Sequence, residues 1–147
     1  MKPTAHVIVS FTLGAALWFF TKNLYAGVLC FASGVLVDFD HFIEYIVHFG
    51  WKKITFKKIY YACDRRVFKR LYIIFHSIEI VILVWIAAIC IKNIYLLAVA
   101  LGYSSHLVMD SLGNPVRASF YFIFWRGVNN FDKKWFLKKN FGDKSRI

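Results

Sequence analysis

Four long apolar segments constrain this chain more than any other feature of its sequence. They comprise 16, 14, 21 and 16 residues, and they are residues 5–20, 24–37, 71–91 and 94–109. A helix that crosses the hydrocarbon core of a bilayer needs about 20 residues. Three of the segments are therefore short for a membrane span, unless their polar ends continue the helix through space lined by protein.

Amino-acid composition favours a membrane protein over a soluble helical bundle. Hydrophobic residues make up 59% of the 147 residues, and the chain contains 16 Phe, 8 Tyr and 5 Trp. A chain of this size has too little interior to bury that much apolar surface in one core. We therefore predict an all-α polytopic membrane protein, a single membrane domain over residues 1–147 with four transmembrane helices arranged as two hairpins.

Basic residues predict the orientation of these spans. The chain carries 19 Lys and Arg against 8 Asp and Glu, and in a four-span topology all but Lys22 and Lys92 fall on one side. Because short loops rich in Lys and Arg remain in the cytoplasm, both termini, the basic loop 42–70 and the tail 112–147 are expected to be cytoplasmic. These basic residues would bind anionic lipid head groups, and no recognition motif for nucleic acid accompanies them.

The tail contains one more aromatic run, at residues 120–125. It is too short to span a bilayer, and aromatic rings favour the boundary between lipid and water. We expect this segment to lie at the membrane interface.

Ionisable residues collect at the predicted cytoplasmic end of every span. Each costs a few kcal/mol at membrane depth unless it pairs or binds an ion. His106 and Asp110, four residues apart, share one face of a helix. Histidine with carboxylate suits zinc, and also manganese or iron, whereas the three cysteines lack metal-ligand spacing and are taken as structural. The predicted ligands of one or two ions are His6, Asp38, Asp40, His41, His76, His106 and Asp110.

At single positions a simpler interpretation stays open. A lone His6 or His76 near a helix end is usually just a hydrogen-bonded histidine, and Asp38 and Asp40 can cap a helix that begins near His41. Convergence of so many donors at one level of four helices is what favours a metal site. Two further residues are assigned to the solvated face of the basic loop: Glu44 and His48.

An internal repeat emerges at an offset of 70 residues. Seven of the 35 positions from His6 to Asp40 are identical at this offset, including His6 with His76 and Asp40 with Asp110. Chance matching in a chain rich in Ile, Lys, Asn and Tyr is the alternative. A true repeat would relate the two hairpins by a pseudo-twofold axis along the membrane normal, with these four residues near the axis. The predicted ligands without counterparts are Asp38, His41 and His106.

Four short motifs stand in order along the chain: TAH at residues 4–6, GVLVDFDH at 34–41, FHS at 75–77 and GYSSHLVMDSLGNP at 102–115. Over about residues 4–126 the chain resembles a LexA-regulated, inner-membrane-associated family of metal-dependent hydrolases. The resemblance implies a multi-helix protein of the bacterial inner membrane with the His and Asp ligands named above. Val37 replaces the family's Pro, and residues 71–75 replace a lead that contains an arginine, whose substrate-binding role Arg70 would take.

The predicted function is that of a metal-dependent hydrolase at the cytoplasmic membrane face, acting on a phosphoester or another lipid-linked ester. A metal of this kind activates water and polarises the scissile bond. The candidate catalytic proton acceptors are Asp38 and Glu79. The candidates for binding a substrate phosphate are Arg70 and Arg117.

Two other functions fit the same residues. A small metal-binding or metal-transporting membrane protein would need polar residues through the whole bundle, and the outer halves of the spans offer little beyond Ser10 and Thr12. A structural membrane module would use the His and Asp network to fix helix packing without metal. Metal content separates the structural module from the other two.

Overall fold

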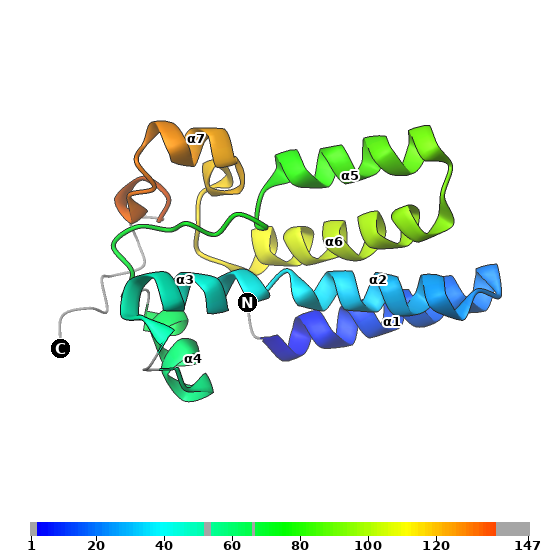
Figure 1. Cartoon of the computed structure of the whole chain (residues 1–147), viewed down its shortest axis with the longest axis horizontal. Helices are drawn as coiled ribbons and strands as arrows, with labels where there is room; N and C mark the ends of the chain where they lie inside the picture. Colours follow the sequence, from blue (N-terminus) through cyan, green and yellow to red (C-terminus); the bar gives the residue numbers. More distant parts are fainter. Residues whose placement is uncertain (1–2, 52–53, 66, 138–147) are drawn as a thin grey trace. The chain divides into compact units, whose positions relative to one another are not determined.

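The computed structural model describes residues 3–51, 54–65 and 67–137, and within them all regular secondary structure is helical (Figure 1). The elements are α1 (Pro3–Thr21), α2 (Leu24–Leu36), α3 (Phe39–Phe49), α4 (Phe56–Arg65), α5 (Ile78–Ile91), α6 (Ile94–Gly113), η2 (Ala118–Tyr121), α7 (Ile123–Val128) and η3 (Lys133–Trp135). The all-α prediction is confirmed for this part of the chain.

The chain divides into two compact units. The bundle unit comprises Met1–Val37 with Ser77–Asn114 and contains α1, α2, α5 and α6. The second unit comprises Asp38–His76 with Pro115–Ile147 and contains α3, α4, α7 and the two short 3-10 helices. Each unit therefore combines two stretches of chain that are distant in sequence.

The turns before α2 and α6 of the bundle unit have the same local conformation. Lys22 and Lys92 adopt left-handed φ angles of 56° and 53°, and each is followed by an extended asparagine that begins the next helix. The Asn23 side chain accepts one backbone N–H bond from the first turn of α2 at 3.1 Å, and the Asn93 side chain accepts two from α6 at 2.8 and 3.2 Å. Asparagine caps of this kind satisfy N–H groups that a helix start leaves unpaired.

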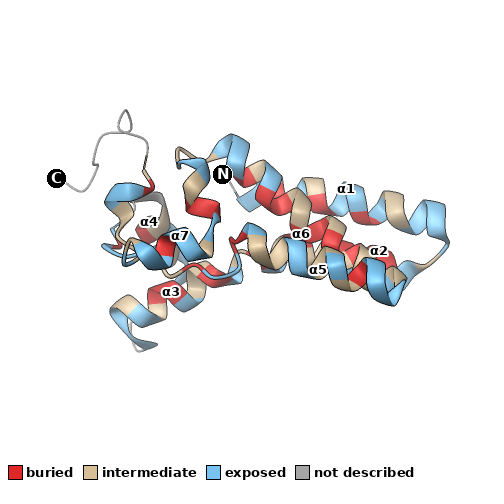
Figure 2. Cartoon of the chain, turned by 90° about the horizontal axis from the view of Figure 1, so that it is seen from above, coloured by how far each residue is buried: buried red, intermediate tan, exposed pale blue. Residues whose placement is uncertain are grey.

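Small residues bring the bundle helices close together. A Cβ added at Gly102 of α6 would overlap the carbonyl oxygen of Cys30 in α2, and one at Gly34 would overlap the Ser10 side chain of α1. Around Cys30 the core is formed by alanines, namely Ala26 and Ala98. Helices that pack in lipid use small residues at their contacts in this manner. Buried positions recur along α2 and α6, whereas Ala88 is the buried residue of α5 (Figure 2).

Three helical stretches are long and apolar enough to cross a membrane: Pro3–Thr21, Ile94–Gly113, and Leu24–Phe49 when α2 and α3 are taken together. Large apolar side chains on the bundle helices face outward, with Phe11 and Leu83 65% and 63% exposed. α5 is equally apolar but has 14 residues. This finding is compatible with a membrane protein. A fourth span at α5 stays a prediction.

The expected third span, residues 71–91, is corrected by the structure. Its helical part is α5, which begins at Ile78, while residues 71–77 are not helical. Ser77 is extended at the start of α5, and Leu71 and Ile73 are buried within the second unit. Hydropathy did not reveal this boundary, because a buried irregular segment and a membrane helix are equally apolar.

The expected basic loop, residues 42–70, is also more ordered than predicted. α3 extends through its first part to Phe49, and α4 occupies Phe56–Arg65. A helix does begin beside Asp38, as the capping interpretation required, but the Asp38 side chain makes no capping hydrogen bond. Capping therefore does not account for this aspartate.

The aromatic run at residues 120–125 serves two purposes. Phe120 and Tyr121 are buried in the second unit, whereas Phe124 and Trp125 are exposed on α7. An interfacial position therefore stays a prediction for the exposed Phe124 and Trp125, and the buried Phe120 and Tyr121 do not contact lipid.

Candidate metal site

Three of the predicted ligands meet inside the bundle unit. His106 and Asp110 lie one turn apart on α6, and His6 lies on α1. His6 Nε2 is 3.0 Å from Asp110 Oδ1, and His106 Nε2 is 3.7 Å from Asp110 Oδ2. All three residues are at most 3% exposed, so this polar cluster is withdrawn from solvent.

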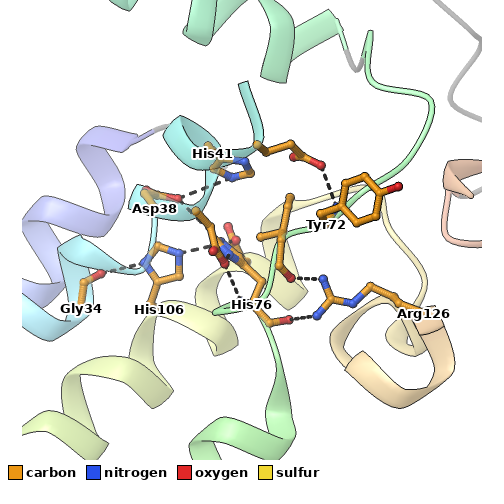
Figure 3. Close-up of polar contacts among 11 residues, drawn as sticks. Gly34, Asp38, His41, Tyr72, His76, His106 and Arg126 are labelled. Atoms are coloured by element: carbon orange, nitrogen blue, oxygen red, sulfur yellow. Dashed lines mark hydrogen bonds and ion pairs between the residues drawn. The ribbon is translucent and has the colours of Figure 1, made fainter. Parts of the chain in front are cut away.

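The protonation of His106 follows from its surroundings. Its Nδ1 lies 2.7 Å from the carbonyl oxygen of Gly34 in α2 (Figure 3). A carbonyl can only accept, so Nδ1 carries the hydrogen and the neutral ring has its lone pair on Nε2. Metal-binding histidines are commonly oriented by such a bond from the opposite nitrogen to a backbone carbonyl. His106 Nε2, which lies 3.7 Å from Asp110 Oδ2, can thus offer its lone pair to a metal ion.

His6 is less completely satisfied. Its ring stacks on that of His106 with centroids 4.0 Å apart, and its Nδ1 is buried without a hydrogen-bond partner among the described residues. A buried unpaired polar atom costs roughly 1–3 kcal/mol. An unpaired Nδ1 on a histidine whose Nε2 contacts a carboxylate calls for an explanation, and a role in function is one.

The donor set fits a metal ion. His6, His106 and Asp110 each offer one ligand atom, and these atoms lie within 4.8 Å of one another. Tetrahedral bonds of 2.0 to 2.1 Å place zinc ligands about 3.3 Å apart, and the two contacts of Asp110 lie on either side of that value. Three protein ligands with one open position is the arrangement of catalytic zinc sites. The bundle cluster can therefore hold a metal ion, and the structure does not select which one.

The remaining predicted ligands contact one another within the second unit. Asp40 Oδ2 lies 3.3 Å from His76 Nδ1 and accepts the His76 backbone N–H at 3.2 Å. His76 Nε2 lies 3.7 Å from Asp38 Oδ1, and His41 Nε2 lies 3.7 Å from the same oxygen. Asp40 thus orients His76 through Nδ1 and leaves Nε2 directed at Asp38, as carboxylates do for metal-binding histidines.

The predicted set of seven ligands is therefore brought together as two groups. The bundle unit holds His6, His106 and Asp110, and the second unit holds Asp38, Asp40, His41 and His76. A single centre formed by all seven stays a prediction. Asp40 contacts Nδ1 of His76 and so is placed to orient that ring.

The predicted catalytic and substrate-binding residues are placed as follows. Asp38 is one-third exposed beside His41 and His76, and Glu79 lies half-buried in the first turn of α5. Arg70 is exposed and donates to the Tyr72 hydroxyl at 3.2 Å, and Arg117 is exposed at the start of η2. Their roles stay predictions, and Asp38 is the one in contact with two histidines of the second unit.

Two buried charged residues were missed by the sequence reasoning. Glu44, assigned to a solvated face, is 2% exposed and accepts the Tyr72 backbone N–H at 2.9 Å, so that assignment is wrong. Arg126, counted only as a basic residue of the tail, is fully buried. Glu44 lies one turn after Asp40 on α3, a spacing that places two carboxylates on one helix face. That spacing could have indicated Glu44, whereas no sequence pattern marks Arg126.

His48, also assigned to the solvated face, is half-buried, and its Nδ1 lies 3.0 Å from the Glu44 carbonyl oxygen. Cys63 of α4 fits the structural role predicted for the cysteines. Burial, with smaller contributions from the charges of Glu44 and Asp38, raises the pKa of this thiol to about 12. A thiol with so high a pKa is not a nucleophile at neutral pH.

Comparisons with models of protein families, with curated proteins and with solved structures found no match to this chain. The site must therefore be interpreted from its own geometry.

Proposed function

We propose that this protein is a membrane-embedded metal-dependent hydrolase of the LexA-regulated, inner-membrane-associated family that its motifs resemble. The observation that carries the proposal is the buried set of His6, His106 and Asp110, in which the Gly34 carbonyl fixes the His106 tautomer with its lone pair on Nε2. A bound divalent metal, with zinc as the first candidate, would supply Lewis acidity and an activated water.

The protein's own residues would divide the work by position. The two histidines and Asp110 would bind the ion, and the Gly34 carbonyl would keep the His106 ring oriented. Asp38, one-third exposed and beside His41 and His76, is the proposed proton acceptor. Glu79 is the second candidate for that role. Arg70 and Arg117 are exposed cations that would hold the phosphate of a phosphoester or the head group of a lipid-linked ester.

The proposed location is a bacterial inner membrane with both termini in the cytoplasm. α1, α2, α5 and α6 would be the four spans, because they form two hairpins with the same capped turn. At 14 residues α5 is about 21 Å long, shorter than the ~30 Å hydrocarbon core. The exposed Lys57 and Lys58 of α4 would contact anionic lipid head groups.

One specific observation favours a second candidate, a structural module without metal. The 3.0 Å contact of His6 Nε2 with Asp110 Oδ1 is also a good hydrogen bond between a histidine and a carboxylate. A buried pair of this kind can fix helix packing by itself. The two candidates differ in metal content.

Metal analysis of the purified protein in detergent tests the proposal. We expect zinc or another divalent ion in stoichiometric amount in the wild type and its loss in His106→Ala and Asp110→Ala, both still inserted in the membrane. His48→Ala is the matched control, because His48 is half-buried but outside the ligand groups, and it should keep its metal. Wild-type protein without metal after loading would overturn the proposal in favour of the structural module.

Hydrolysis is then measured on metal-loaded protein with bis-p-nitrophenyl phosphate and with phospholipid in mixed micelles. We expect turnover that His106→Ala abolishes and His48→Ala retains. Stoichiometric metal with no turnover of either substrate would contradict the enzymatic part and favour a metal-binding or metal-transporting protein.

A further inference from the structure

An irregular stretch, residues 69–76, leads to His76 in the second unit and is here called the strap. It is neither a helix nor a strand of a sheet, and Leu71 and Ile73 within it are buried. Backbone N–H and C=O groups in a buried irregular segment need partners from elsewhere. In the strap, charged side chains supply several of them.

One side of the strap is bonded by two carboxylates of α3. Glu44 Oε1 accepts the Tyr72 N–H at 2.9 Å, and Asp40 Oδ2 accepts the His76 N–H at 3.2 Å. Asp40 and Glu44 are four residues apart on the helix, and the two amides are four residues apart on the strap. Two carboxylates one turn apart on α3 therefore bond the strap at two points.

The other side of the strap is bonded by the C-terminal segment. The Arg126 guanidinium of α7 donates to the carbonyl oxygens of Ile73 and His76 (Figure 3). The backbone N–H of Leu71 donates to the Phe131 carbonyl at 2.9 Å. On this side, the strap backbone is therefore bonded by Arg126 and Phe131, which are not predicted ligands.

Burial indicates that this arrangement is more than a chance contact. The chain has 19 Lys and Arg residues, and among those whose side chains the structure describes, Arg126 alone is buried. Burying a guanidinium costs several kcal/mol unless opposite charges and hydrogen bonds compensate. Glu44 and Asp40, 2% and 4% exposed, accept two backbone N–H groups of the same strap.

We propose that Arg126 and Glu44 are positioning residues that hold the strap between α3 and the C-terminal segment and so direct His76 Nε2 at Asp38. The inference rests on the proposed function and extends it, because it assigns His76, with Asp38, to the second of the one or two ions predicted from the sequence. It also gives the C-terminal segment a role in the site although that segment contributes no predicted ligand.

The test compares zinc affinity in Arg126→Met, Arg126→Lys and Glu44→Ala, using the full chain in detergent. Arg126→Met leaves two buried carbonyls without their donor, so we expect zinc binding to weaken about 10- to 100-fold, as loss of an orienting group does. Arg126→Lys keeps a cationic donor and should recover part of the affinity. Lys134→Met, on an exposed lysine of the same segment, is the matched control and should bind zinc as the wild type does.

Amide hydrogen exchange gives a readout that needs no metal. The Tyr72 and His76 amides should lose protection in Glu44→Ala and Arg126→Met, while Ala98 in the bundle core keeps its protection. Unchanged exchange at Tyr72 and His76 together with unchanged zinc affinity would overturn the inference. If the wild type binds no zinc but the two variants still show these exchange changes, the proposed function and the role of His76 in it are overturned. The attachment of the strap by Arg126 and Glu44 would then stand. If Arg126→Met does not fold, the Arg126→Lys and Glu44→Ala comparison decides.

Discussion

The pairs His6–Asp110 and His76–Asp40 reach similar contacts by different means. In the bundle unit, His6 Nε2 meets Asp110 because two helices pack closely. In the second unit, His76 lies on the irregular strap, which charged side chains bond, and its Nδ1 contacts Asp40 of α3. A regular packed helix fixes a ligand through its backbone, whereas an irregular segment needs other side chains to do so. The first kind of pair should be sensitive to helix packing and the second to distant charges.

The pairing also bears on the repeat. The histidine that opens the first hairpin contacts the aspartate that ends the second, and the histidine that opens the second hairpin contacts the aspartate that ends the first. Exchange of partners is what a pseudo-twofold relation produces. The turns before α2 and α6 share one local conformation, with φ angles of 56° and 53° at Lys22 and Lys92, and the repeat itself stays a prediction. At the histidines the repeats differ, since His6 is helical and His76 is not.

The largest effect is expected from Gly102→Ala, which breaks the helix-packed side of the comparison. The added Cβ would overlap the Cys30 carbonyl oxygen, backbone that cannot move alone, and overpacking of this kind costs about 3 kcal/mol. We expect a lower melting temperature and changed histidine NMR signals for His6 and His106. Gly127→Ala, where nothing lies within 4 Å of the new Cβ, is the control. Equal behaviour of the two variants would show that close packing does not build the bundle site.

A second, intermediate effect separates a ligand from an orienting carboxylate. Asp110→Asn replaces a proposed ligand, whereas Asp40→Asn keeps an acceptor for the His76 backbone N–H. We expect zinc affinity to fall about 10- to 100-fold in Asp40→Asn, as for other orienting groups, and further in Asp110→Asn. Titration with a competing zinc chelator measures both. If Asp40→Asn loses zinc as completely as Asp110→Asn, Asp40 is a ligand, as the sequence predicted, and the contrast between the pairs disappears.

The smallest effect concerns the hairpin turns and sharpens the repeat. A left-handed conformation costs a residue with a side chain roughly 1 kcal/mol that glycine does not pay. Lys22→Gly and Lys92→Gly should each raise stability by up to that amount, and by equal amounts if the turns are equivalent. Unfolding of detergent-solubilised protein by increasing denaturant measures the difference. A gain in one variant with a loss in the other would show that the two turns are not equivalent in the folded protein.

Sequence alone determined the all-helical character of the described residues and named the histidines and aspartates that contact one another in each unit. These follow from local rules, because apolar blocks exclude a soluble loop-rich fold, and His106 and Asp110 share a face through the helix repeat alone. The sequence also placed histidine and aspartate at matching ends of the two hairpins, which the exchanged pairs now join.

Tertiary structure decided what local rules do not contain. Residues 71–76 are not helical, and their backbone is bonded by side chains of α3 and of α7. The burial of Glu44 and Arg126 depends on partners that lie 28 and 53 residues away in the sequence. The tautomer of His106, with the hydrogen on Nδ1, depends on the Gly34 carbonyl, 72 residues distant. Hydropathy and spacing describe a residue and its near neighbours, whereas the free energy of a buried charge or a ring tautomer is set by whichever distant groups the fold brings against it.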